Sequence, residues 1–194
     1  MLKTLRGRRW TGWSKRQPSL LRPFPVLRVE ELEARTVPAT FPWTGAGSNP
    51  NWSTAANWAG GTAPSPLGGD DLRFPVGTPV RTTVNDFTNA SFNSFTVSDS
   101  DYTLQGNSLR LANTVVVGSG LTRSKIDLDV QLTATAGSKQ FFTVGNNTDF
   151  TINGKISGST GAIFTKDGTG ILILTGDNSS FTGDMYVDTA GALE

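Results

Sequence analysis

Residues 166–193 read KDGTGILILTGDNSSFTGDMYVDTAGAL, a stretch in which Leu172 and Leu174 share one face of an extended chain and glycines recur at short intervals. Alternation with a period of two is typical of a β-strand that buries one face. Glycine permits corners that a Cβ atom would obstruct, and an asparagine such as Asn178 can satisfy backbone groups at a bend. We therefore expect short strands joined by corners. The side chains expected to face the core are Leu172, Leu174, Phe181, Val187 and Leu193.

The spacing of these residues resembles a known repeat. The matching positions are Gly168, Gly170, Leu172, Leu174, Gly176, Asn178, Phe181, Gly183, Val187, Gly191 and Leu193. In this register the stretch resembles the autotransporter-associated β-strand repeat of bacterial passenger proteins. The resemblance implies an all-β fold, a right-handed parallel β-solenoid, in an exported protein at the cell surface or outside the cell. Residues 166–193 form one good repeat in place of an array, so we expect the chain to be truncated and further C-terminal repeats of the same protein to be missing.

Short β-patterned segments also precede the repeat from about residue 71 onward. The clearest is 125–132, where Ile126, Leu128, Val130 and Leu132 alternate with polar residues and predict one strand with one buried face. Such strands, separated by turn residues, fit either an antiparallel sandwich or a solenoid. The repeat favours the solenoid, so residues 71–194 are expected to form a β-solenoid.

Residues 41–70 are rich in Trp, Gly and Asn and predict a cap or loop segment. Trp43, Trp52 and Trp58 are spaced so that they fit neither one helix face nor one strand face. In one interpretation the rings cap an open end of the core. In the other they stack on sugar rings, with the asparagines at 49, 51 and 57 as hydroxyl partners. Surface glycans or other envelope components are the partners that this second interpretation implies.

Residues 1–40 differ from the rest in charge. Residues 1–35 contain nine Lys or Arg and three Glu. Residues 36–194 contain eight Lys or Arg and thirteen Asp or Glu. This basic leader contains too little apolar surface to fold, so we expect it to be disordered. Residues 29–40 resemble the L-E-x-R-x-x-P-A element that closes the leader of many large bacterial exported proteins, which implies export. The rest of the chain is acidic and shows no basic face that would extend the basic leader. We therefore expect no nucleic acid partner.

The composition excludes several kinds of chemistry. The chain has no Cys and no His, which rules out disulfides, Cys/His zinc sites, thiol nucleophiles and Ser-His relays within it. No apolar run reaches the roughly 18 residues of a transmembrane helix. Asp127 and Asp129 would lie roughly 7 Å apart on one strand face, a spacing that suits either a plain polar face or a shared cation.

We therefore expect a structural or adhesive passenger-type segment with no catalytic residue, no cofactor and no resident metal. Two alternatives stay open. One is a β-solenoid polysaccharide lyase or hydrolase, a class that works with carboxylates, Lys and Arg and so does not need histidine. The other is a carbohydrate-binding module that uses Trp43, Trp52 and Trp58.

Overall fold

A computed structural model describes residues 38–188 and 191–194 of the chain. Apart from a short 3-10 helix, η1 (Ala55–Asn57), the regular structure of these residues is β, in three sheets. The first sheet has seven strands: β1 (Thr40–Pro42), β2 (Asp71–Phe74), β5 (Ser94–Val97), β8 (Val115–Val117), β11 (Lys139–Val144), β14 (Ile163–Asp167) and β16 (Asp184–Val187). The second has six: β3 (Thr82–Asn85), β6 (Thr103–Gly106), β9 (Lys125–Ile126), β12 (Asp149–Ile152), β15 (Ile171–Leu174) and β17 (Ala192–Leu193). The third has four: β4 (Ala90–Phe92), β7 (Leu109–Leu111), β10 (Val130–Leu132) and β13 (Ile156–Gly158).

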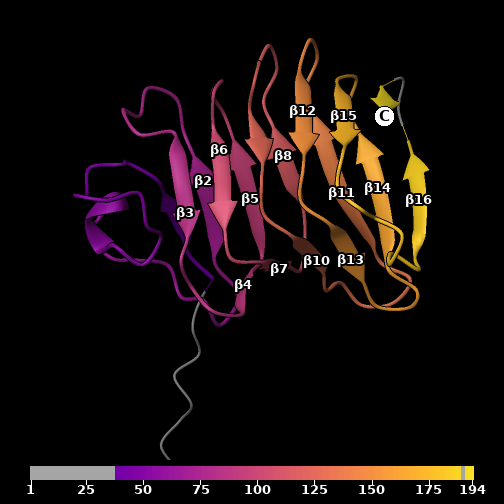
Figure 1. Cartoon of the computed structure of the whole chain (residues 1–194), viewed down its shortest axis with the longest axis horizontal. Coiled ribbons are helices and arrows are strands. Elements are labelled where there is room, and N and C mark those ends of the chain that lie inside the picture. The colour runs from indigo at the N-terminus through magenta and orange to yellow at the C-terminus, as the bar shows by residue number, and fades with distance from the viewer. Residues whose placement is uncertain (1–37, 189–190) are drawn as a thin grey trace, which may run out of the picture. The chain divides into compact units, whose positions relative to one another are not determined.

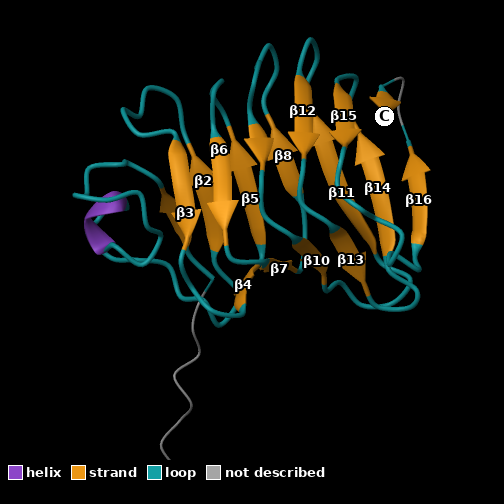
Figure 2. Cartoon of the chain, viewed as in Figure 1, coloured by secondary structure: helices purple, strands orange, loops and turns teal. Residues whose placement is uncertain are grey.

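The chain coils through the three sheets in a fixed order. From β2 to β13 it visits the first, second and third sheet in turn and then returns to the first (Figure 1). Every pair of neighbouring strands is parallel, as between β2 and β5 or between β12 and β15. Figure 2 shows the strands of one sheet side by side, with loops at the corners. The expected parallel β-solenoid is therefore confirmed, and the antiparallel sandwich is wrong.

The interior consists of columns of apolar side chains, one from each turn. In the first sheet, Leu72 pairs in register with Phe95, Phe95 with Val115, and Val115 with Phe142. All four side chains are buried. Because parallel strands pair in register, each column is a continuous stack along the solenoid axis, and burial of its apolar surface stabilises the stack.

The segment 125–132 departs from its predicted form. It contains two strands, β9 and β10, because the chain turns a corner at residues 127–129 and passes from the second sheet to the third. Ile126, Leu128, Val130 and Leu132 are nevertheless all buried, as their alternation predicts. Gly154 lies beside this corner in the next turn, and a Cβ atom there would collide with the carbonyl oxygen of Leu128. Only glycine allows the two corners to stack so closely.

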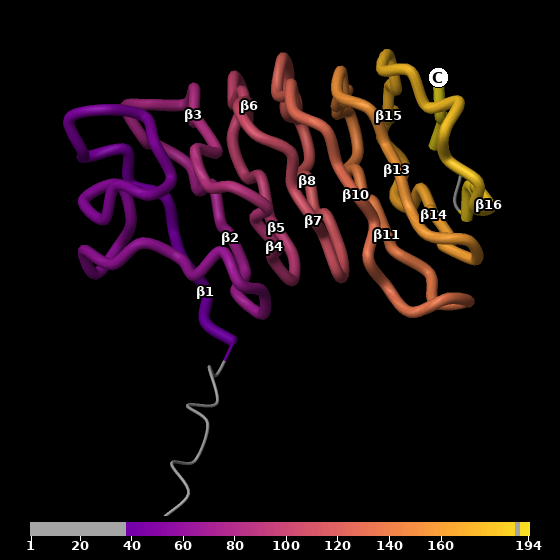
Figure 3. The backbone as a smooth tube through the Cα atoms, turned by 60° about the horizontal axis from the view of Figure 1, so that its bottom comes forward, coloured from indigo at the N-terminus to yellow at the C-terminus, as the bar shows by residue number. Residues whose placement is uncertain are grey.

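The segment 41–70 packs at the N-terminal end of these sheets, before β2 (Figure 3). It contributes β1, the helix η1 and the three buried tryptophans, with loops between them. The expected basic leader, residues 1–40, including the export-type element at 29–40, lies outside the described residues except for its last three positions. Thr40, the last of these, begins β1.

The repeat at the C-terminal end continues the solenoid with one change. After β15 the chain forms no strand in the third sheet, and residues 175–183 cross that side as a loop. Leu172 is buried, and Leu174, Phe181 and Leu193 are partly buried and pack against the core, as expected. Val187 was expected in the core but is 46% exposed. It pairs with the buried Lys166 and so shares its face, but no described strand pairs with the other edge of β16.

Candidate functional site

The three tryptophans of the candidate glycan site come together in the core. Trp43 and Trp52 expose none of their surface and Trp58 exposes 2%. The rings of Trp43 and Trp58 meet edge to face at a centroid distance of 5.1 Å, and those of Trp52 and Trp58 at 6.5 Å. Phe74 of β2 contacts all three rings. The turns within residues 41–70 thus bring together three rings whose spacing in the sequence fits no single helix or strand face.

The indole N–H groups are part of the same packing. Trp43 Nε1 donates to the carbonyl oxygen of Val80 at 2.8 Å, and Trp58 Nε1 donates to that of Trp52 at 2.7 Å. The Nε1 atom of Trp52 is buried and has no hydrogen-bond partner among the described residues. The three ring faces have no access to a sugar in this structure. Glycan stacking on Trp43, Trp52 and Trp58 therefore stays a prediction, and it requires the cap to open.

The asparagines near the tryptophans hold the loop together. Asn57 is buried, and its Oδ1 accepts a hydrogen bond from the N–H of Gly47. Its Nδ2 donates to the carbonyl oxygens of Asn49 and Asn51. One side-chain amide therefore satisfies three backbone groups, and sequence reasoning missed this role because it treated these residues as ligand contacts.

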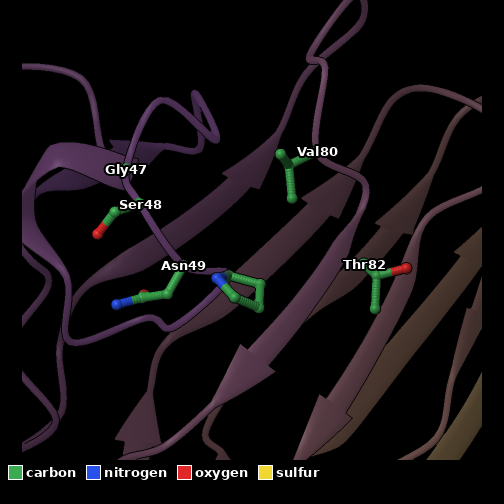
Figure 4. A pocket seen from close by; sticks show the side chains of 6 residues that line it. Gly47, Ser48, Asn49, Val80 and Thr82 are labelled. Carbon is green, nitrogen blue, oxygen red and sulfur yellow. The ribbon is translucent and has the colours of Figure 1, made fainter.

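A pocket of about 330 Å³ opens beside this loop (Figure 4). Its walls are Gly47, Ser48, Asn49, Pro50, Val80 and Thr82. Figure 4 shows Asn49 on one side of it and Val80 and Thr82 on the other. These residues include no titratable side chain, so the pocket offers van der Waals contact and a few hydroxyl and amide groups but no acid or base.

The carboxylates of Asp127 and Asp129 each have protein partners. Asp127 forms an ion pair with Lys125 at 2.8 Å and accepts a hydrogen bond from Asn153 Nδ2. Asp129 accepts one from the backbone N–H of Lys155. The contacts from Asn153 and Lys155 link successive turns at one corner. Across the described ranges 38–188 and 191–194, no three acidic side chains gather as a metal site would require.

A second charged group joins the turns at another corner. Asp99 accepts hydrogen bonds from the backbone N–H groups of Gly77 and Ser100 and pairs with Arg81 at 2.6 Å. The hydrogen bond from Gly77, followed by that from Ser100 and the Arg81 charge, lowers the pKa of Asp99 below its usual value. Asp101 pairs with Arg123, and this bond lowers the pKa of Asp101. Each carboxylate therefore stays ionised and stabilises the corner.

An aromatic cluster that sequence reasoning missed lies on the outer face of the first sheet. It consists of Lys139 and Phe141 on β11, Tyr186 on β16, and Asp188 just after β16. Lys139 Nζ lies 6.0 Å from the ring centroid of Phe141, 5.7 Å from that of Tyr186, and 2.8 Å from a carboxylate oxygen of Asp188. Tyr186 is 46% exposed. The available signal was the alternation of side chains between the two faces of a strand, which places Tyr186 on the face opposite Met185 and Val187.

The described residues contain no helix that is both long enough and apolar enough to cross a membrane. A passenger-associated-transport-repeat family model matches residues 164–194. This match confirms the resemblance inferred from residues 166–193. No curated protein and no solved structure matches the chain.

Proposed function

We propose that this chain, which carries a passenger-associated transport repeat at residues 164–194, is a structural segment of an exported bacterial protein that is displayed at the cell surface or released. Its solenoid would act as a rigid stalk or scaffold, and adhesion would be a property of the whole protein. The observation that carries the proposal is continuity of register. The repeat joins the first sheet through the pairing of β14 with β11 and of β16 with β14.

The physical argument concerns length and rigidity. In a solenoid each turn contacts only its neighbours, so the structure extends by adding turns and does not need a closed globular core. Parallel strands lie about 4.8 Å apart, so each turn adds about that much length. Such a fold suits a spacer. The interactions that recur here are corner contacts between turns, such as those of Asp99 and Asp129, which stabilise the stack.

The test is to locate the protein in the bacterium that makes it. Antibodies raised against residues 71–188 should label intact cells or the culture medium without permeabilisation. An antibody against a cytoplasmic protein is the control and should label permeabilised cells only. Labelling of the solenoid that also depends on permeabilisation would contradict export.

A second candidate function is contact with surface glycans at the outer aromatic cluster, not at the buried tryptophans. A sugar ring presents an apolar face to an aromatic ring and hydroxyls at its rim. Tyr186 offers the exposed ring, and the Lys139–Asp188 pair beside it offers a donor and an acceptor. In a glycan-binding assay Tyr186→Ala should weaken binding, whereas Val116→Ala, at a residue 38% exposed on β8, should not. Equal binding by both variants would refute this role.

The polysaccharide lyase or hydrolase alternative also stays a prediction. It requires acidic or basic side chains that converge on a bound chain. The carboxylates of Asp99, Asp127 and Asp129 are instead engaged in contacts between turns. Shortening of a purified polysaccharide during incubation with the protein would support the enzyme and count against a purely structural role.

A further inference from the structure

Lys166 occupies a position in the core column of the first sheet that is apolar in the other turns. It pairs in register with Phe142 on β11 and with Val187 on β16. Its side chain exposes no surface. The five preceding members of the column are Phe41, Leu72, Phe95, Val115 and Phe142. A lysine here interrupts a hydrophobic stack, which is costly unless its amine is hydrogen-bonded.

The amine finds its partners at the corner between β14 and β15. Lys166 Nζ donates to the carbonyl oxygen of Asp167 at 3.0 Å and to that of Gly168 at 2.6 Å. Asp167 is the last residue of β14, and Gly168 directly follows it at the corner. The long aliphatic stem of lysine fills the core position while its tip reaches these carbonyl groups.

Gly191 of the next turn lies against the same amine. A Cβ atom at this position would collide with Lys166 Nζ and would lie 2.5 Å from the carbonyl oxygens of Gly168 and Gly170. The backbone at Gly191 therefore closes over a small polar space that the carbonyl groups of the corner surround. Glycine is required because any side chain would enter that space.

From this geometry we propose that the corner after β14 is a binding site for a primary ammonium group, and that the chain's own Lys166 fills it. The site consists of backbone carbonyl oxygens, so it selects a small cation with several N–H donors. By filling it, Lys166 fixes the β14–β15 corner in the conformation on which the Gly191 corner stacks. This inference goes beyond the proposed function, because it concerns how one turn of the solenoid stacks on the next. It does not depend on where the protein is located.

Two effects oppose each other at this amine. Burial lowers the pKa of Lys166, and the charge of Asp167 opposes that shift. An amine in a purely apolar site would lose its proton readily, whereas hydrogen bonds to carbonyl oxygens favour the charged form. Lysine presents three donors and no acceptor, which matches a site built from acceptors alone.

The test uses two variants and one control in the full chain. Lys166→Met preserves the apolar stem and removes the amine. Lys166→Ala removes the stem too and leaves space for n-propylammonium, which has the length of the deleted atoms. Lys155→Met changes an exposed lysine and is the control. The measurement is amide hydrogen exchange in β15, β16 and β17, compared with β2 and β5.

In Lys166→Met we expect the amide protection of β15, β16 and β17 to fall by at least about tenfold, while that of β2 and β5 is unchanged. In the Lys155→Met control, all of these strands should keep the protection of the wild type. In Lys166→Ala, n-propylammonium should restore protection in a saturable way. Tetramethylammonium, which has no N–H donor, should not. The proposal would be overturned if Lys166→Met kept the amide protection of the wild type. It would also be overturned if n-propylammonium and tetramethylammonium had the same effect on Lys166→Ala.

The wild-type protein provides a test that does not depend on how the variants fold. In a 15N-labelled sample, the Nζ protons of Lys166 should exchange slowly enough to be observed when those of Lys155 exchange too fast. Equally fast exchange at both lysines would mean that the amine is not held by the carbonyl groups, and would overturn the proposal.

Discussion

The side-chain carbonyl oxygen of Asn178 accepts a hydrogen bond of 2.7 Å from the backbone N–H of Ile156. Ile156 begins β13, the last strand of the third sheet. Because the repeat forms no strand there, this contact satisfies a backbone group that a further strand would otherwise bind. Asn178 thus joins the loop 175–183 to the solenoid.

Replacing Asn178 by Ala should lower the free energy of unfolding by about 1 kcal/mol, because the N–H of Ile156 loses its acceptor. Chemical denaturation measures the change. Ser180→Ala, at an exposed position of the same loop, is the control and should stay within experimental error of the wild type. Equal stability of the two variants would show that the Asn178 contact contributes nothing.

Trp58→Ala should lower the free energy of unfolding by about 3–5 kcal/mol, since it removes a buried ring from a well-packed core. Thermal denaturation with and without added sugars measures this effect, and sugars should not alter it. A variant of wild-type stability that had lost glycan binding would contradict the cap and support the stacking of sugars on the tryptophans.

The pH dependence of stability should include a contribution from Asp99. Its pKa is lowered in the folded protein, so its stabilising effect is complete above the ordinary value of 3.8 and is lost as the pH falls through the lower folded value. Between neutral pH and strong acid, the wild type should therefore lose more stability than Asp99→Asn. Asp149→Asn, at an exposed carboxylate, is the control and should follow the wild-type curve. Parallel curves for wild type and Asp99→Asn would refute this contribution.

A polypeptide of residues 1–194 should associate through the edge of β16. Met185 and Val187 pair with core-facing residues of β14, yet they are 39% and 46% exposed. A strand edge with exposed apolar side chains favours pairing with another chain. Sedimentation over a wide concentration range should show association that Val187→Lys weakens. Val116→Lys, on the outer face of β8, should leave it unchanged. A monomer at every concentration would contradict an open edge.

Sequence patterns predicted those features of the fold that depend on local alternation. The prediction that one face of the segment 125–132 is buried was correct, because burial of every second residue persists around a corner. The residues of this face are Ile126, Leu128, Val130 and Leu132. The corner itself was missed, since alternation alone does not show where a strand leaves one sheet for the next. The burial of the tryptophans depends on loops that join distant positions, which spacing alone does not define.

Two features of the repeat could not be predicted from residue types alone. Lys166 is polar and was given no inward position, but its stem fills the core and its amine binds backbone carbonyl groups that appear only once the corner forms. Val187 was predicted to be buried because it falls on an apolar position of the repeat pattern. Its exposure depends on what stacks on β16, which is a tertiary property.

The central claim is that residues 164–194 form a turn of the same solenoid as the strands before them. The chain has no Cys, so an introduced pair reports without interference. Lys139 and Ile163 are register partners on β11 and β14, and their Cα atoms should lie about 4.8 Å apart, within disulfide range. Under mild oxidation, Lys139→Cys with Ile163→Cys should form an intramolecular disulfide, whereas Phe141→Cys with Ile163→Cys, two residues out of register, should not. Disulfide formation in the mismatched pair alone, or in neither pair, would contradict the claim.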